Sequence, residues 1–315
     1  MNLQLSTRVR AFSIGICACD SSSELPGLIS FLQSENFHGF ELYRIIIVAS
    51  GCDECTMKSV RRLVAHDRRI MLIEESHRHG KADAINKILS NSQGNYIVFV
   101  NADALPLDGS ISRLLAVAER SPSIGLVSGK AIIGNGERNS TTSSIEDFMW
   151  TVHSECSSRM NLSEKNNHGC DEMMVVRSEA LSESLPPSII NDGAYIGGIL
   201  KRDGFAVKFC ESAEVTINVP ERVSDLIGQR RRIIFGHFQI WRLTGRSPWT
   251  VESLLLFSPL LALGIVVNSL AKNPKLIRIS PIAVICEFVS VFLALKDNVR
   301  RNSSGKHQIW ARYAK

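Results

Sequence analysis

The feature that most constrains this fold is an alternation of apolar runs and helical patterns between residue 11 and about residue 129. The apolar runs are continuous, as expected for parallel strands that are covered on both faces. They occupy residues 11–16, 44–49, 69–74 and 96–100. The segments between them have the spacing of amphipathic helices, at residues 25–32, 55–65 and 81–89. This alternation predicts an α/β fold with an open, mostly parallel sheet.

Polar side chains stand at the ends of several of these predicted strands. Asp20 follows the first strand, Ser50 follows the second and Asp103 follows the fourth. Ligands of open α/β sheets bind beyond the carboxyl ends of the strands, so we expect one crevice to collect these residues. Asp103 is the most informative of them, because a carboxylate at the tip of a buried strand is costly unless a cation meets it.

The middle of the chain is less regular. Residues 130–168 are rich in Gly, Asn, Ser and Thr around an amphipathic piece at residues 145–160, and we interpret them as a mobile insertion. Residues 172–181 resume the ordered fold, and residues 190–215 have the pattern of a short helix followed by a strand. The run QRRR lies in a basic amphipathic segment at residues 221–243. We therefore predict a sheet domain over residues 1–222 and an interface segment over residues 223–250.

Two long apolar runs follow this segment. Residues 253–271 carry no charge, and residues 279–295 carry one, Glu287. A membrane-spanning helix needs about 20 apolar residues, so residues 251–297 are predicted to form two transmembrane or re-entrant helices. The alternative is a pair of buried or interfacial helices. The basic residues around both runs place the main domain and the tail, residues 298–315, on the cytoplasmic face of the membrane.

Composition sets only broad limits on function. The formal net charge of +5 is mild, so it argues weakly for an anionic partner, and we expect no nucleic-acid partner. The eight cysteines lack paired ligands at zinc spacing, which favours small buried side chains in a reducing compartment. Asp20 interrupts the first apolar run, which favours a core strand over a secretory signal.

Four short motifs carry candidate chemistry, and each has an ordinary structural alternative. Asp103 suits a divalent cation that bridges to a phosphate, although an acid after a strand is commonly a turn residue. Asp192 has the position of a general base or of a plain helix N-cap. Lys81 opens a helix whose N-terminus suits an anion, or it is a solvated lysine. The QRRR run suits a diphosphate or anionic lipid headgroups, or it is a membrane-facing strip.

The order of these motifs resembles that of one family. An acidic motif after a strand is followed by an Asn191-Asp192 helix start and then by Gln229-x-x-Arg232 before apolar helices. This arrangement, over residues 10–250, is similar to the large inverting glycosyltransferase family 2, which has a GT-A fold and includes cellulose, chitin and hyaluronan synthases. The resemblance implies a Rossmann-like catalytic domain followed by membrane helices.

The resemblance also implies roles for particular residues. Asn101-Ala102-Asp103 matches the metal-binding D-x-D motif, so Asp103 is expected to hold Mn²⁺ or Mg²⁺ on a nucleotide-sugar donor, with Asn101 beside it. Asp192 matches the catalytic base. Gln229 and Arg232 match the Q-x-x-R-W motif and are expected to hold the diphosphate or the acceptor.

The remaining donor-site residues follow from neighbouring motifs. "HGKADAIN" resembles the family's G-K-A motif and implies that Lys81 and Asp83 lie on the nucleotide side. "IIIVASGCDECT" resembles the segment that holds the nucleotide base, with Ser50 in place of an acid. Asp20 is assigned to the same donor site because it follows the first strand.

Two departures from the family pattern shape the functional prediction. Ile233 replaces the tryptophan of Q-x-x-R-W, which favours a single transfer over polymer extrusion. We therefore expect a membrane-associated, cytosol-facing inverting glycosyltransferase that acts on an acceptor hydroxyl, in glycolipid or polysaccharide formation, with a lipid-linked acceptor as one option. Asn101, Ala49 and Ser50 stand where the family has acids, which keeps open a catalytically silent nucleotide-sugar-binding relative. An oxidoreductase is disfavoured because no G-x-G-x-x-G follows the first strand.

Overall fold

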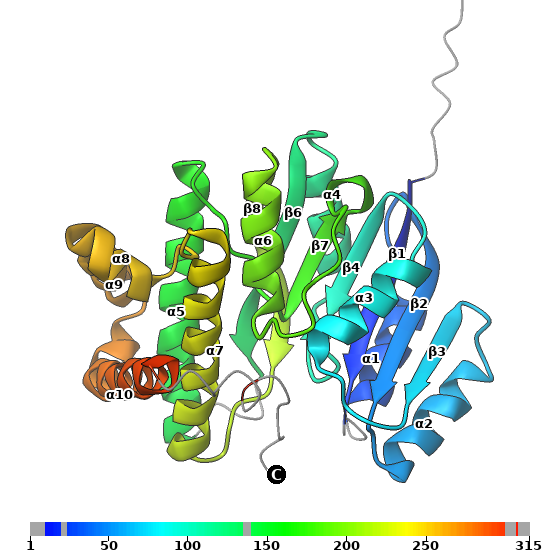
Figure 1. Cartoon of the computed structure of the whole chain (residues 1–315), viewed down its shortest axis with the longest axis horizontal. Coiled ribbons are helices and arrows are strands. Elements are labelled where there is room, and N and C mark those ends of the chain that lie inside the picture. Colours follow the sequence, from blue (N-terminus) through cyan, green and yellow to red (C-terminus); the bar gives the residue numbers. More distant parts are fainter. Residues whose placement is uncertain (1–9, 20–23, 135–139, 300–306, 308–315) are drawn as a thin grey trace, which may run out of the picture.

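The fold is built on one eight-stranded sheet with the strand order β3-β2-β1-β4-β7-β6-β8-β5. The computed structural model describes residues 10–19, 24–134, 140–299 and 307 (Figure 1). Parallel pairing joins the first four strands, β1 (Arg10–Ala18), β2 (Phe40–Ser50), β3 (Ile70–Glu75) and β4 (Tyr96–Val100). The four apolar runs of the sequence are these strands, so the prediction of an open α/β sheet is confirmed.

The second half of the sheet is mixed. Its strands are β5 (Leu105–Pro106), β6 (Ile124–Ile133), β7 (Met173–Arg177) and β8 (Ala206–Ile217). Strand β7 runs antiparallel to both of its neighbours, and Val100 at the end of β4 pairs with Met173 at the start of β7. The residues just before β7 therefore lie at the same edge of the sheet as the residues just after β4.

Helices cover both faces of this sheet. One apolar cluster joins one face to α1 (Leu25–Ser34), α2 (Glu54–Val64) and α4 (Ser110–Ala118). A second cluster joins the other face to α3 (Lys81–Asn91) and α6 (Asp192–Arg202), which lie in front of the sheet in Figure 1. Burial on both faces explains why the parallel strands are apolar along their whole length.

Helix α5 (Thr141–Leu162) corrects the prediction of a mobile insertion. Ser140 begins it with a capping box, and its apolar side chains form a third cluster with the C-terminal helices. These side chains recur at helical spacing and include Ile145, Phe148, Val152, Cys156 and Met160. The amphipathic piece expected at residues 145–160 is thus part of an ordered helix, and the Ser, Thr and Asn residues that suggested mobility fill its other faces.

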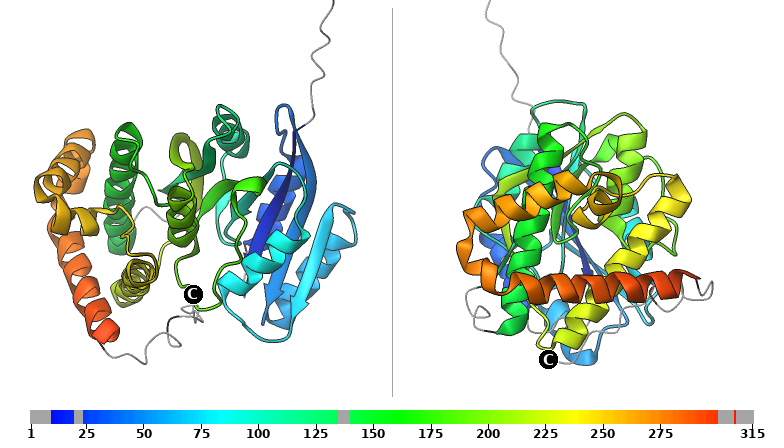
Figure 2. Two further views of the ribbon diagram at one scale, coloured as in Figure 1. Left: turned by 45° about the horizontal axis from the view of Figure 1, so that its top comes forward. Right: turned by 90° about the vertical axis from the view of Figure 1, so that its left-hand side faces the viewer.

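The C-terminal helices lie at the opposite end of the molecule from β1–β3 (Figure 2). They are α7 (Val223–Thr244), α8 (Val251–Phe257), α9 (Pro259–Lys272) and α10 (Ser280–Val299). Within the described residues, no helix combines the length and the apolarity that a membrane span requires. The prediction of transmembrane helices is therefore wrong for this part of the chain. The uncharged run of residues 253–271 is divided between α8 and α9, since Pro259 starts a new helix.

Helices α8 to α10 nevertheless expose a broad apolar surface. In α10, the outward side chains include Ile285, Phe288 and Phe292, which are 61–68% exposed, whereas the inward ones include the small residues Ala283 and Ala294. This is the reverse of a helix that packs its large apolar side chains inward. We define the apolar surface as the exposed side chains Leu255, Leu256, Phe257, Leu260, Leu261, Leu263, Val267, Ile277, Ile282, Val284, Ile285, Phe288, Val289, Phe292, Leu295 and Val299.

Candidate active site

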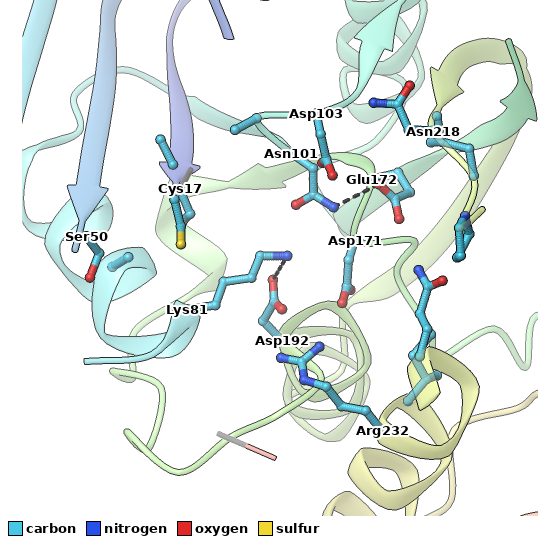
Figure 3. A pocket seen from close by; sticks show the side chains of 18 of the residues that line it. Cys17, Ser50, Lys81, Asn101, Asp103, Asp171, Glu172, Asp192, Asn218 and Arg232 are labelled. Atoms are coloured by element: carbon cyan, nitrogen blue, oxygen red, sulfur yellow. Dashed lines mark hydrogen bonds and ion pairs between the residues drawn. The ribbon is translucent and has the colours of Figure 1, made fainter. Parts of the chain in front are cut away.

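A pocket of about 360 Å³ opens beyond the carboxyl ends of β1, β2 and β4. It collects most of the residues that the sequence singled out, and Figure 3 shows several of them facing one another. Two predicted residues are not among them. Asp83 lies 2.7 Å from Lys87 and outside the pocket lining, and Asp20 falls outside the described residues. The predicted residues that line the pocket are Ser50, Lys81, Asn101, Asp103, Asp192, Gln229 and Arg232.

Asp192 is held at the start of α6. Asn191 is the N-cap, and its side-chain oxygen accepts a hydrogen bond from the Ala194 N–H. Asp192 is only 3% exposed, and its Oδ2 lies 3.1 Å from Nζ of Lys81, the first residue of α3 (Figure 3). The alternative interpretation of Asp192 as a helix N-cap is therefore wrong, because Asn191 is the N-cap. The Asp192 carboxylate lines the pocket instead.

Asp171 and Glu172 also line the pocket, although the sequence interpretation did not name them as site residues. These residues precede β7, whose antiparallel direction brings them next to the end of β4. The Asn101 side-chain N–H donates to Glu172 Oε2 at 2.8 Å, and the Asn101 backbone N–H donates to the Glu172 carbonyl at 3.1 Å. The available signal in the sequence was an acidic pair directly before a buried strand. That signal places the pair at the pocket only if β7 is known to run antiparallel to β4.

The pocket holds more negative than positive charge at its centre. Burial, reinforced by Asp103, raises the pKa of Glu172 to about 7. Burial, reinforced by Asp192, raises the pKa of Asp171 well above its usual range. Burial also opposes the charge on Lys81, but Asp192 and Asp171 outweigh it and raise the pKa of that lysine. A further cation would therefore be stabilised among these carboxylates.

The carboxylate oxygens of this pocket fit a divalent cation whose remaining ligands are phosphate oxygens. Asp103 and Glu172 offer carboxylate oxygens on adjoining strand ends, and the buried carboxylate of Asp171 lines the same pocket. No cluster of three or more acidic, histidine or cysteine ligands arranged for a metal ion occurs among the described residues. Mg²⁺ is usually bound in this way, by one or two carboxylates plus the phosphates of a substrate.

The residues of the QRRR run make two kinds of contact: some line the pocket, and others form ion pairs with neighbouring helices. Gln229 and Arg232 line the pocket, and Gln229 Oε1 is buried without a hydrogen-bond partner. Arg230 instead lies 2.6 Å from Glu252 and 2.9 Å from Glu287, and Arg231 lies 2.5 Å from Asp297. The hypothesis that all three arginines meet a diphosphate or headgroups is therefore wrong for Arg230 and Arg231, which bind α7 to α8 and α10.

Comparison with known proteins finds a matching family, a similar curated sequence and a similar solved structure. The family described as "Glycosyl transferase family 2" matches residues 13–185, more than half of the chain. An N-acetylglucosaminyltransferase of Azorhizobium caulinodans is 21% identical over 224 residues, which are 68% of this chain and 56% of that protein. The chain thus spans a little over half the length of that curated relative.

A solved structure with a similar fold is a mannosyltransferase from Pyrobaculum calidifontis in complex with GDP-Man and Mn²⁺. Its TM-score is 0.65 at 16% sequence identity, and the match covers 93% of this chain and 88% of that one. At this identity the likeness establishes the fold, so the GT-A architecture expected from the sequence is confirmed for the sheet domain.

Proposed function

Because the chain belongs to glycosyl transferase family 2, we propose that it transfers a sugar from a nucleotide-sugar donor to an acceptor hydroxyl, with inversion at the anomeric carbon. The observation that carries the proposal is one pocket in which Asp192 and Lys81 face Asn101, Asp103 and Glu172. A buried general base next to a cation-binding carboxylate set is what a direct displacement requires.

The residues divide the reaction between them. Asp192 accepts the proton of the acceptor hydroxyl as its oxygen forms a bond to the anomeric carbon and the bond to the diphosphate breaks. Arg232, which also lines the pocket, would meet the negative charge that develops on the diphosphate. A divalent cation held by Asp103 and Glu172 would supply further charge stabilisation there. The mannosyltransferase with the similar fold, which holds GDP-Man and Mn²⁺, supports this use of the site.

Asp103→Asn is expected to weaken metal-dependent nucleotide binding by about 10- to 100-fold, because the strand-end carboxylate is lost while Glu172 remains. The measurement is a titration of nucleoside diphosphate binding against Mn²⁺ concentration. Asp108→Asn, an exposed acid a few residues further on and outside the pocket lining, is the control and should bind as the wild type does. Equal metal requirements in the wild type and Asp103→Asn would remove Asp103 from the site.

We also propose that the apolar surface lies against the cytoplasmic face of a lipid bilayer. Among the described residues, the large hydrophobic side chains that are exposed outside residues 241–299 are Tyr43, Leu105, Leu107 and Leu162. Lys272 and Lys275 adjoin the surface, and their side chains stay more than half exposed although they pair with Glu155 and Asp147, so they suit anionic headgroups. Helix α7, which contributes Gln229 and Arg232 to the pocket, packs on α10 through the Arg231–Asp297 pair. A lipid-linked acceptor would therefore reach the pocket from its own bilayer.

Replacing Ile285, Phe288 and Phe292 together by Gln is expected to weaken binding to vesicles of anionic lipid by at least about 100-fold, because each side chain contributes roughly 1.5 kcal/mol when it is buried. Cosedimentation with phosphatidylglycerol vesicles measures this loss. Leu162→Gln removes an apolar side chain that is 81% exposed elsewhere on the protein, and it should leave vesicle binding unchanged. Equal binding by the triple variant would show that a different surface meets the lipid.

The proposed transferase activity is tested with purified protein, Mn²⁺ or Mg²⁺, lipid vesicles that carry acceptors, and a panel of nucleotide sugars. The expected result is acceptor-dependent release of a nucleoside diphosphate from one donor. Saturable binding of a donor without any release would instead identify a catalytically silent relative, the alternative motivated by Asn101 in the acidic motif.

A further inference from the structure

The loop at residues 188–191, which leads into Asp192, is held by side chains of α7. Gln239 contacts the loop twice: its Oε1 accepts from the Ile190 N–H at 3.1 Å, and its Nε2 donates to the Ser188 carbonyl at 2.7 Å. Gln239 is only 6% exposed. A buried amide that satisfies both a donor and an acceptor of the same loop fixes the path of that backbone.

His237, on the same helix, holds the N-cap residue itself. Its Nε2 lies 3.1 Å from Asn191 Nδ2, and both side chains are buried. Because Asn191 Oδ1 already accepts from the Ala194 N–H, its Nδ2 is the donor and His237 Nε2 is the acceptor. Burial lowers the pKa of His237 to about 4, so the ring is neutral and able to accept at neutral pH. Both the oxygen and the nitrogen of the Asn191 side-chain amide are thus hydrogen-bonded.

Close backbone packing reinforces these hydrogen bonds. A Cβ atom on Gly236 would stand 3.0 Å from Asn191 Cβ and 3.3 Å from Asn191 N, so a larger residue would have to push this loop away by a few tenths of an ångström. Arg232, one turn earlier on α7, donates to the Ile190 carbonyl at 3.4 Å. One helix therefore lines the donor pocket with one part and fixes the residues before Asp192 with another.

We infer that His237 and Gln239 are positioning residues for Asp192, an inference that rests on the proposed function. They do not line the pocket, and they act through Asn191 and Ile190. Asp192 follows Asn191 directly, so a change in the cap rotates its carboxylate relative to the acceptor hydroxyl. A misplacement of about 1 Å at a reacting group can lower the rate about 100-fold.

Two variants that differ by one methylene group test this role. The amide of His237→Gln reaches the position of the imidazole Nε2 and can accept from Asn191, whereas the shorter amide of His237→Asn cannot. We expect kcat of His237→Asn to fall about 10- to 100-fold with the donor KM unchanged, and kcat of His237→Gln to stay within about threefold of the wild type. His153→Asn is the control, because its ring lies in the same stack of histidines and no hydrogen bond to the 188–191 loop is found for it in the described residues.

The outcomes separate this inference from the proposed function. Equal kcat values for the Gln and Asn variants, or a matching loss in His153→Asn, overturn the positioning role. Metal-dependent nucleotide binding confirms that each variant is folded. If His237→Asn does not fold, Gln239→Met replaces it, since its side chain has a similar length but makes neither the hydrogen bond with Ile190 nor the one with Ser188. An unchanged kcat in Gln239→Met then overturns the inference. A wild type that releases no nucleoside diphosphate from any donor contradicts the proposed function itself.

Discussion

Asp192→Asn is expected to lower kcat by 10²- to 10⁴-fold, roughly the contribution of a positioned general base. The amide has the shape of the carboxylate but cannot accept the acceptor's proton. The α6 N-cap is kept, because Asn191 rather than Asp192 supplies it. Donor binding should therefore persist, and the loss should appear in kcat when nucleoside diphosphate release is followed at saturating donor.

A matched control for this variant lies at the other end of the same helix. Asp203 is the C-cap of α6 and pairs with Arg202 at the surface, so Asp203→Asn should leave kcat unchanged. If Asp192→Asn kept more than about a tenth of wild-type turnover, another group would have to remove the proton. Asp171 is the acid next to it in the pocket and would become the candidate.

Arg230→Met is expected to lower the free energy of unfolding by about 3 kcal/mol, since breaking a buried ion pair leaves carboxylates without a partner. Arg230 joins α7 to Glu252 of α8 and Glu287 of α10, and each of the three side chains is only about one-fifth exposed. Urea unfolding followed by circular dichroism measures the loss. Arg202→Met removes an arginine that is 47% exposed and paired with Glu183 and Asp203, so its urea midpoint should stay close to that of the wild type.

The penalty of Arg230→Met should also grow with pH. Burial opposes the charge on Glu252, but Arg230 outweighs it and lowers the pKa of Glu252 to about 2. That pair therefore adds stability above the unfolded pKa near 4.5, and the gain is lost as pH falls toward 2. Burial already raises the pKa of Glu287 to about 7 with Arg230 present. Without Arg230, the pKa of both glutamates rises from these values, and the folded state loses more stability than the wild type as pH rises. A penalty at pH 8 no larger than at pH 5 would contradict this account.

The parallel half of the sheet could be predicted because its signal is local. Each strand from β1 to β4 is a continuous apolar run, and burial on both faces requires that composition. Asp103 and Ser50 then follow from the rule that ligands bind at the carboxyl ends of such strands. The amphipathic spacing at residues 145–160 was visible, but the surrounding Ser and Thr led to the interpretation of a mobile insertion, and the capping box at Ser140 was the overlooked signal of an ordered helix.

The rest of the site depends on contacts that no local pattern contains. Glu172 reaches Asn101 only because β7 runs antiparallel, and strand direction is set by the whole topology. Arg230 and Arg231 look identical to Arg232 in the sequence. What separates them is the position of their acidic partners, which lie on α8 and α10. The two apolar runs predicted membrane-spanning helices from their length alone. Pro259 starts a new helix inside the first run, so that run forms two shorter helices.

The ion pair between Lys81 and Asp192 has a consequence for the order in which substrates act. Lys81 stands among Asp192, Asp171 and Glu172 in the pocket (Figure 3). Under the proposed function, the diphosphate of the donor would attract the Lys81 ammonium group, which would give up part of its contact with Asp192. Arrival of the donor would therefore free the Asp192 carboxylate to meet the acceptor hydroxyl. An acceptor that enters first would find that carboxylate still paired with Lys81, so we expect donor-first kinetics.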